Sequence, residues 1–218
     1  MTQLLARVQQ DSVAATANGN LAAVEASSRG ELIVIDWFAQ MVNEGRGFQL
    51  RIGTITTPTV GDVVITDSAA EMCVDVASGL TMLPTQYDMS VNLGTGTLHE
   101  YAIKSVAGPS TAGTAFTPLP LLIGGTAATS TARVAAAGAV SVVAEAVTTT
   151  RRHWSYSNPV AVGAGHSPGH IEWQPLRPPV VVGSATGSCL YVQVAAATTG
   201  PSYFASLDYI EIASASIV

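Results

Sequence analysis

Short apolar–polar alternations, separated by glycine and proline turns, dominate this chain. Residues 48–52 alternate and stop at Gly53, and residues 87–93 alternate before a turn at 94–96. A period of two residues is typical of half-buried β-strands, and the returning run at 98–106 predicts a hairpin. No strong amphipathic helix interrupts the second half of the chain, whereas an α/β fold would place helices between its strands. The sequence therefore predicts an all-β fold, an antiparallel β-sandwich or jelly roll of about eight to ten strands.

The chain divides into two parts by composition. Residues 1–30 are rich in Ala, Gln, Asn and Ser and have no clear period, so we expect an extended N-terminal arm there. Residues 31–218 are expected to form a single β-sandwich or jelly-roll domain, because no internal linker or repeat divides them. The apolar spacing within 32–42 fits either a strand or a short helix that Gly45 would end, and both interpretations stay open.

Charged residues are scarce along the whole sequence. They make up 11% of the chain, against about 25% in typical soluble domains. A surface so poor in charge predicts that partners cover much of it. The net charge is −6 and Lys104 is the only lysine, so we expect no direct binding to nucleic acid, which needs clustered cations. The adjacent pair Arg151-Arg152 is typical of a solvated turn or an interface salt bridge.

Membrane and secretion signals are not evident in the sequence. No run approaches the roughly 18 apolar residues of a transmembrane helix, and the first residues lack the apolar core of a signal peptide. We therefore expect a protein that is made in a cytoplasm and is not inserted into a membrane.

Candidate metal ligands lie close together in one stretch of the sequence, which contains His166, His170 and Glu172. Imidazoles and a carboxylate can hold a divalent metal when they converge. His166 and His170 lie in a Pro-Gly loop rather than on one helix face, whereas His170 and Glu172 share a face if a strand begins there. Solvated loop histidines are the rival interpretation, and we expect no metal and no cofactor.

Catalytic motifs are equally sparse. A nucleophile elbow and a phosphate-binding loop with its lysine are absent. Five acidic residues could include a carboxylate pair of the glycosidase type: Asp62, Asp67, Glu71, Asp75 and Asp88. Carboxylates scattered along strands ordinarily serve solvation and edge protection. We expect no catalytic residues and no enzyme activity.

The two cysteines lie far apart in the sequence. Cys73 and Cys189 each sit in a strand-like run, and we expect free thiols that act as small hydrophobic groups. A bridge between them cannot be read from the sequence.

Two further features point to surface contacts. Trp154, Tyr156 and Trp173 flank one Pro- and Gly-rich stretch, where exposed aromatic rings can anchor a protein interface or stack on sugars; Trp173 fits the core equally well. The long connection at 109–130 carries apolar residues between its prolines and glycines, which indicates that it packs onto something.

Four segments of the chain resemble virion structural proteins of tailed bacteriophages. They are the opening run 29–38 (RGELIVIDWF), the run 53–58 (GTITTP) that follows Phe48, and the run 178–183 (PPVVVG) with the aromatic-rich strand that starts at Tyr203. The resemblance implies a jelly-roll or related sandwich, commonly trimeric, that sits on the outside of an icosahedral head and clamps neighbouring capsomers.

The expected function is therefore that of a virion structural protein, made in the host cytoplasm, most specifically a capsid cement or decoration subunit. Its expected partners are the major capsid protein and copies of itself in a homotrimer. The alternatives are a phage tail, baseplate or head-fibre component, or a carbohydrate-binding β-sandwich module.

Overall fold

The structure, a computed structural model, describes residues 37–54, 56–66, 68–93, 98–135, 140–143, 148–157, 169–196 and 200–216. The predicted N-terminal arm at 1–30 and residues 32–36 of the strand alternative at 32–38 lie outside these residues. The described elements comprise one α-helix, sixteen strands and a final 3-10 turn: α1 (Trp37–Asn43), β1 (Gly47–Ile52), β2 (Thr59–Val60), β3 (Ala69–Ala70), β4 (Met72–Asp75), β5 (Leu80–Leu93), β6 (Leu98–Val106), β7 (Thr111–Ala112), β8 (Thr114–Phe116), β9 (Leu119–Pro120), β10 (Thr131–Val134), β11 (Val140–Ser141), β12 (Thr148–Ser157), β13 (His170–Trp173), β14 (Val181–Val182), β15 (Cys189–Ala196), β16 (Ser202–Ala213) and the turn Ser214–Ser216.

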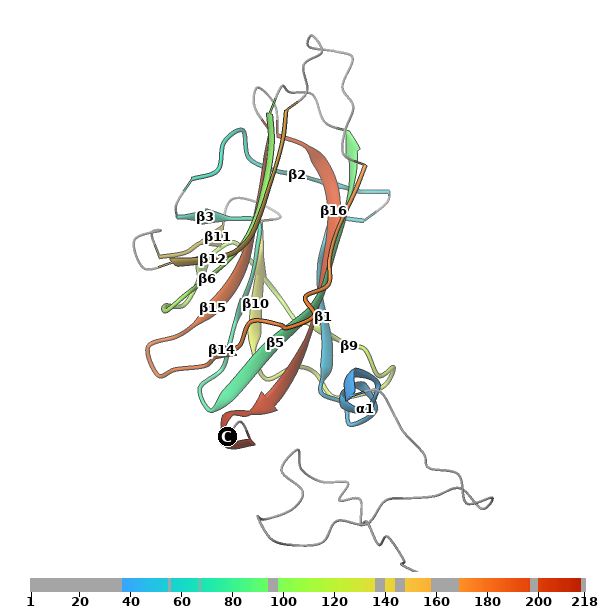
Figure 1. The fold of residues 1–218 in the computed structure, drawn as a ribbon, viewed down its shortest axis with the longest axis vertical. Coiled ribbons are helices and arrows are strands. Elements are labelled where there is room, and N and C mark those ends of the chain that lie inside the picture. The colour runs from blue at the N-terminus through green and yellow to red at the C-terminus, as the bar shows by residue number, and fades with distance from the viewer. Residues whose placement is uncertain are drawn as a thin grey trace, which may run out of the picture.

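The strands form antiparallel sheets arranged as a sandwich, which confirms the predicted all-β class (Figure 1). One sheet has the order β13-β5-β16-β1-β9, with β14 also pairing with β5 and β2 with β16. The facing sheet has the order β12-β6-β15-β4-β10-β8, and a small third sheet has the order β3-β11-β7. Six of the sixteen strands contain only two residues, so ten longer strands carry the sandwich.

The main core lies between the two large sheets and is built from alternate residues of their strands. On β16, for instance, every second residue from Tyr203 to Tyr209 is buried while the residues between them are only partly buried. Aromatic side chains fill much of this space. Five of the six tyrosines of the chain are fully buried: Tyr87, Tyr101, Tyr191, Tyr203 and Tyr209. Alternation in the sequence thus becomes one buried face per strand.

A proline interrupts the long pairing between β5 and β16. The register shifts between Asp208 and Tyr209, with Asp208 opposite Gln86 and Tyr209 opposite Pro84. Thr85 is the extra residue of this bulge, and its hydroxyl donates to the Asp208 carbonyl at 3.1 Å. Because proline has no N–H to give to a sheet, a bulge is one of the few places where an interior strand tolerates it.

Helix α1 covers one end of the outer face of the β13-β5-β16-β1-β9 sheet. Met41 packs against Ile210 and Ile212 of β16 in a small separate cluster. Gly45, with φ +73°, follows the helix, as expected for a residue that ends a helix in the left-handed region. The helix alternative for the 32–42 run is therefore the one seen at Trp37–Asn43.

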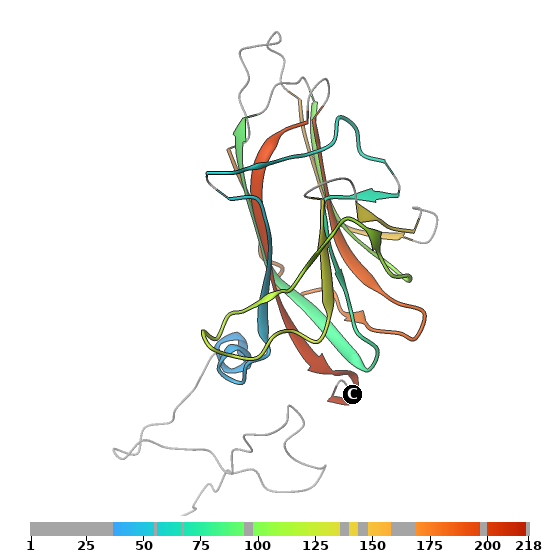
Figure 2. The ribbon, with the colours of Figure 1, turned by 180° about the vertical axis from the view of Figure 1, so that it is seen from behind.

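A crossing segment, residues 59–62, carries the chain from one large sheet to the other (Figure 2). Thr59 and Val60 pair with the start of β16, and Gly61 N–H donates to the Pro201 carbonyl at 2.9 Å. At Asp62 the chain reaches β15, where its N–H donates to Val194 and its carbonyl accepts from Ala196 N–H. The segment therefore joins the two large sheets by backbone hydrogen bonds.

The third sheet covers the outer face of the other large sheet. A second apolar cluster lies beneath it and includes Cys73, Val106, Val140, Val142 and Tyr191. Part of the β12-β6-β15-β4-β10-β8 sheet is therefore buried on both faces. Within the described part of the chain, no helix has the length and apolar character needed to cross a membrane.

Candidate functional site

Outward-pointing polar side chains gather on the part of the β13-β5-β16-β1-β9 sheet that α1 leaves uncovered. We call this surface the outer polar face and define it by Gln49, Arg51, Asp88, Phe204, Ser206 and Asp208, with Thr54, His170 and Glu172 at its rim. Four strands supply all of these side chains except Thr54, which follows β1. On each strand a residue next to them in the sequence is buried.

The pairing registers align these residues in rows across the sheet. Glu172 lies opposite Asp88, Asp88 opposite Ser206, and Ser206 opposite Arg51. In a neighbouring row Asp208 lies opposite Gln49. Directly opposed side chains on one face are close enough to interact, so the register itself assembles the outer polar face.

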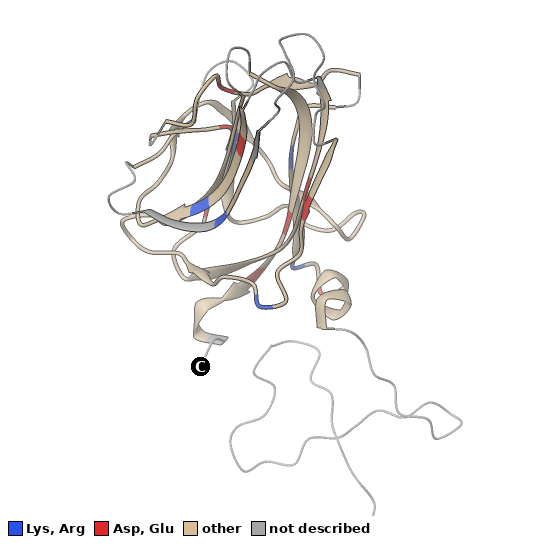
Figure 3. Cartoon of the chain, turned by 45° about the horizontal axis from the view of Figure 1, so that its top comes forward, with Lys and Arg blue, Asp and Glu red and all other residues tan. Residues whose placement is uncertain are grey.

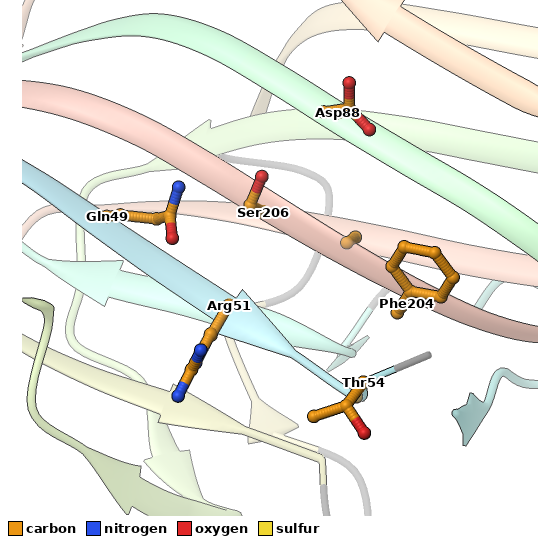
Figure 4. A pocket seen from close by; sticks show the side chains of 8 residues that line it. Gln49, Arg51, Thr54, Asp88, Phe204 and Ser206 are labelled. Atoms are coloured by element: carbon orange, nitrogen blue, oxygen red, sulfur yellow. The ribbon is translucent and has the colours of Figure 1, made fainter. Parts of the chain in front are cut away.

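A shallow pocket of about 260 Å³ opens within this surface, and its side chains are shown in Figure 4. Five of the eight residues that line it are polar and one is aromatic: Gln49, Arg51, Gly53, Thr54, Asp88, Phe204, Ala205 and Ser206. The amide, guanidinium, carboxylate and hydroxyl groups come from β1, β5 and β16 and their flanking residues. Together they can hydrogen-bond a polar ligand that rests on the Phe204 ring.

Hydrogen bonding and burial shape the charges of this face. Gln49 Nε2 donates to Asp208 Oδ1 at 2.9 Å, and His170 Nε2 lies 3.6 Å from Asp88 Oδ2. Burial raises the pKa of Asp208; the hydrogen bond from Gln49 opposes the rise, and the charge of Asp88 adds to it. Asp208 is therefore a half-buried acceptor, whereas Arg51, His170 and Glu172 of the same face are exposed.

No family model matches this chain. No curated protein and no solved structure matches it either.

The candidate metal ligands from the sequence are only partly described. His166 lies outside the described residues. His170 and Glu172 do share one exposed face of β13, with Ile171 between them buried, and they form part of the rim of the outer polar face. His153, which precedes them in the sequence, lies on β12 with its Nε2 3.7 Å from Glu100 Oε1.

The predicted aromatic contacts lie at the edge strands of the two large sheets. Trp154 on β12 is half-buried, 6.4 Å from the Tyr87 ring, and Arg152 lies 5.4 Å above its face. Trp173 on β13 lies opposite Tyr87 and is also half-buried against the core. Tyr156 belongs to β12, and its side chain lies outside the described set. The two tryptophans are therefore partly core residues, and only their remaining surface is open to a partner.

The five acidic residues considered for a carboxylate pair separate into different environments. Asp75 and Asp88 lie on the outward faces of opposite large sheets, and Asp67 is not described. Asp62 and Glu71 are electrostatic neighbours, but Glu71 is only 4% exposed. A substrate has no access to a carboxyl group buried to this degree, so the pair does not form a glycosidase-type site.

Glu71 is nonetheless unusual as a titratable group. Burial raises its pKa to about 8, the charge of Asp62 adds to the rise, and hydrogen bonds from Tyr203 and the Asp62 backbone oppose it. Tyr203 Oη donates to Glu71 Oε2 at 3.4 Å. At neutral pH the buried carboxyl is therefore mostly protonated in the folded chain.

Sequence reasoning missed two groupings that the fold creates. One is the outer polar face, whose members are ordinary polar residues of four separate strands. The other is a cluster of Cys73, Asp75 and Cys189, which is the one group of three possible metal ligands within the described residues. Its local signal was the Cys73-Val74-Asp75 alternation, which places a thiol and a carboxylate on one strand face.

Proposed function

We propose that this chain is a virion structural protein, a capsid cement or decoration subunit that acts through protein–protein contacts without catalysis. The observation that carries the proposal is an apolar loop tip that reaches into solvent from a firmly anchored base. Its expected partners are the major capsid protein and further copies of the chain, as a homotrimer.

The loop tip begins in β9, continues past it and lies beside α1 (Figures 1 and 2). Ile123 is 98% exposed there, and Leu119 and Leu122 are exposed as well. Isolated exposed apolar residues are common, but a tight group of them on one loop marks an interaction surface. We define the contact tip as Leu119, Leu122 and Ile123.

The loop is held in place by one hydrogen bond within the contact tip and by two more on its C-terminal side. Leu121 N–H donates to the Gly47 carbonyl at 2.9 Å. Further along, the buried carboxylate of Glu211 accepts hydrogen bonds from Thr129 N–H at 3.1 Å and Ser130 N–H at 3.0 Å. A surface whose backbone is already fixed loses less conformational entropy on binding. These anchors therefore favour a permanent contact surface.

The distribution of charge also supports contact with other proteins. Figure 3 shows few charged segments, spread over both large sheets without a continuous patch of either sign. Exposed apolar side chains occur in other loops too, including Val63, Val64 and Leu176. Protein interfaces are depleted of charge at their centres, which fits this surface.

The first test is the molar mass of the purified chain by light scattering after size exclusion. We expect three times the monomer mass of 22.3 kDa for the wild type and a monomer for Ile123→Asp, because a buried unpaired carboxylate opposes assembly. Leu176→Asp makes the same apolar-to-acidic change on another loop and should keep the wild-type mass. A wild-type monomer, or an Ile123→Asp variant that still assembles, would contradict this role for the contact tip.

A second candidate function is carbohydrate binding at the outer polar face. The specific observation is the pocket in which hydrogen-bonding side chains surround the Phe204 ring. Aromatic rings stack on the apolar faces of sugars, while planar polar groups hydrogen-bond the hydroxyls.

A glycan array tests this second candidate. We expect a selective signal that Phe204→Ala reduces at least tenfold, because the substitution removes the stacking surface. Trp37→Ala removes an exposed aromatic ring from α1, away from the pocket, and should leave the signal unchanged. If no glycan on the array binds selectively, carbohydrate binding is excluded and the structural role is the one that remains.

A further inference from the structure

Three potential metal ligands meet on the outward face of the β12-β6-β15-β4-β10-β8 sheet. Cys73 and Asp75 are two residues apart on β4 and therefore share a face. Cys189 on β15 lies directly opposite Asp75. The two sulfur atoms and a carboxylate oxygen all lie within 4.8 Å of one another. Strands from distant parts of the sequence thus bring two thiols and one carboxylate together.

The spacing is close to that of a tetrahedral zinc site. Zn–S bonds of about 2.3 Å and Zn–O bonds of about 2.0–2.2 Å place neighbouring ligand atoms about 3.4–3.8 Å apart. Cys73 Sγ lies 4.0 Å from Asp75 Oδ1. Side-chain shifts of less than about 1 Å would therefore bring the three atoms to bonding distance.

The carboxylate already has the supporting contacts that metal ligands commonly have. Ser110 N–H donates to Asp75 Oδ1 and Ser110 Oγ donates to Asp75 Oδ2, each at 2.6 Å. Arg133 Nε lies 4.0 Å from Asp75 Oδ2, and Arg133 also donates to the Ala112 carbonyl at 3.2 Å. Such second-layer contacts fix the orientation of a ligand and raise metal affinity.

The surroundings suit a closed site that excludes water. Both cysteines are fully buried, and apolar residues of the second cluster lie around them, including Val106 and Val140. Burial raises the pKa of the Cys73 thiol, and Cys189 and Asp75 add to the rise. Metal ligation requires the thiolate form of cysteine, so binding of the cation releases thiol protons to solvent. Two thiolates and a carboxylate around a divalent cation carry one net negative charge, which Arg133 faces.

A disulfide is the alternative use of two neighbouring cysteines, and the register disfavours it. Cys73 lies opposite Tyr191, two residues from Cys189, so the cysteines are diagonal neighbours. Diagonal Cα atoms in an antiparallel pair lie roughly 7–8 Å apart, whereas disulfides usually need about 4.4–6.8 Å. A bridging cation spans the longer separation without moving the backbone.

We propose that Cys73, Asp75 and Cys189 bind one zinc ion. Two soft thiolates and one hard carboxylate match the borderline preference of Zn²⁺. A water molecule or the Ser110 hydroxyl would occupy the fourth coordination position of the zinc ion. Because Ser110 immediately precedes β7, the bound ion would tie the small third sheet to the large sheet beneath it.

The test uses the full chain from cells grown with added zinc, purified with a reductant and without a chelator. We expect about one zinc per chain by inductively coupled plasma mass spectrometry. After unfolding with a chelator and refolding, Zn²⁺ should raise the melting temperature by several degrees, since a ligand that binds only the folded state stabilises it. Mg²⁺ prefers oxygen ligands and should have no such effect.

Variants separate this site from zinc bound elsewhere. Cys73→Ser, Cys189→Ser and Asp75→Asn should each lower the zinc content at least fivefold, and Asp88→Asn, on the other large sheet, should not. Cd²⁺–thiolate absorbance of the wild type gives a second measurement that does not depend on a variant folding. Wild-type protein with reduced thiols and less than about a tenth of a zinc per chain would overturn the proposal. So would full zinc content in the cysteine variants, or a Cys73–Cys189 disulfide in protein alkylated before lysis.

Discussion

Replacing Glu71 with glutamine is expected to raise the free energy of unfolding at pH 8 by about 2–4 kcal/mol. The same substitution should change it little near pH 4.5. The reason lies in the buried carboxyl group, whose pKa is raised to about 8 from an ordinary value of 4.5. Glutamine has nearly the same shape, can still accept the hydrogen bond from Tyr203, and never ionises.

The direction of the pH dependence follows from proton binding in the two states. Between pH 4.5 and 8 the folded chain holds a proton on Glu71 that the unfolded chain has released. The stability that this proton contributes is fully present at pH values below the pKa of the Glu71 carboxyl in the unfolded chain. It is lost as the pH rises through the pKa of the same carboxyl in the folded chain. The wild-type chain should therefore become less stable from pH 4.5 to pH 8, and Glu71→Gln should remove this part of the slope.

Urea unfolding curves at several pH values between 4.5 and 8.5 measure the effect. Glu172→Gln is the matched control, because it makes the same change at an exposed position of β13 and should leave the slope as in the wild type. Parallel stability curves for the wild type and Glu71→Gln would show that the carboxyl ionises normally in the folded chain.

Gly200→Ala is expected to destabilise the chain by about 3 kcal/mol. A β carbon at this position would overlap the carbonyl oxygen of Gly61 in the crossing segment. That oxygen belongs to backbone, which cannot rotate away as a flexible side chain can. The substitution must therefore push the crossing segment away from the start of β16, where Gly61 N–H donates to the Pro201 carbonyl.

The comparison for this substitution is Gly79→Ala. Gly79 has φ +81° and nothing within 4 Å of an added β carbon, so only the left-handed backbone is penalised, by about 1–2 kcal/mol. Denaturant midpoints of the two variants separate the effects. Equal losses would show that the close approach of Gly61 and Gly200 relaxes without cost.

Periodicity was sufficient to predict the fold class, because strands such as β1 and β16 bury alternate residues, although β15 is buried on both faces. The alternation of 48–52 and 87–93 corresponds directly to strands β1 and β5. The predicted hairpin of 87–93 with 98–106 was wrong, because β5 and β6 lie in different sheets and pair with other strands. Strands of two residues, such as β9 and β11, have no period to detect and form only where a neighbour supplies hydrogen bonds. For the same reason the run at 32–42 was ambiguous: Met41 is fixed by its contact with Ile210 and Ile212, which lie at the other end of the sequence.

The candidate sites were harder to predict because they depend on which strands are neighbours. Gln49, Asp88 and Ser206 are outward residues of three predicted strands, but only the position of β16 between β5 and β1 brings them together. Cys73 and Asp75 were visible as an alternating pair, while Cys189 joins them only through the register of β4 with β15. Sequence separation alone carries no information about such pairings.

The position of β16 has a consequence for how the chain acquires its structure during synthesis. β5 and β1 lie on either side of β16, yet a ribosome makes both of them long before it reaches residue 202. Until β16 has been made, β5 and β1 lack the strand that pairs with both of them. Unpaired strands with apolar faces are prone to aggregate. Closure of this sheet is therefore a late, long-range event, as expected for a slow-folding topology.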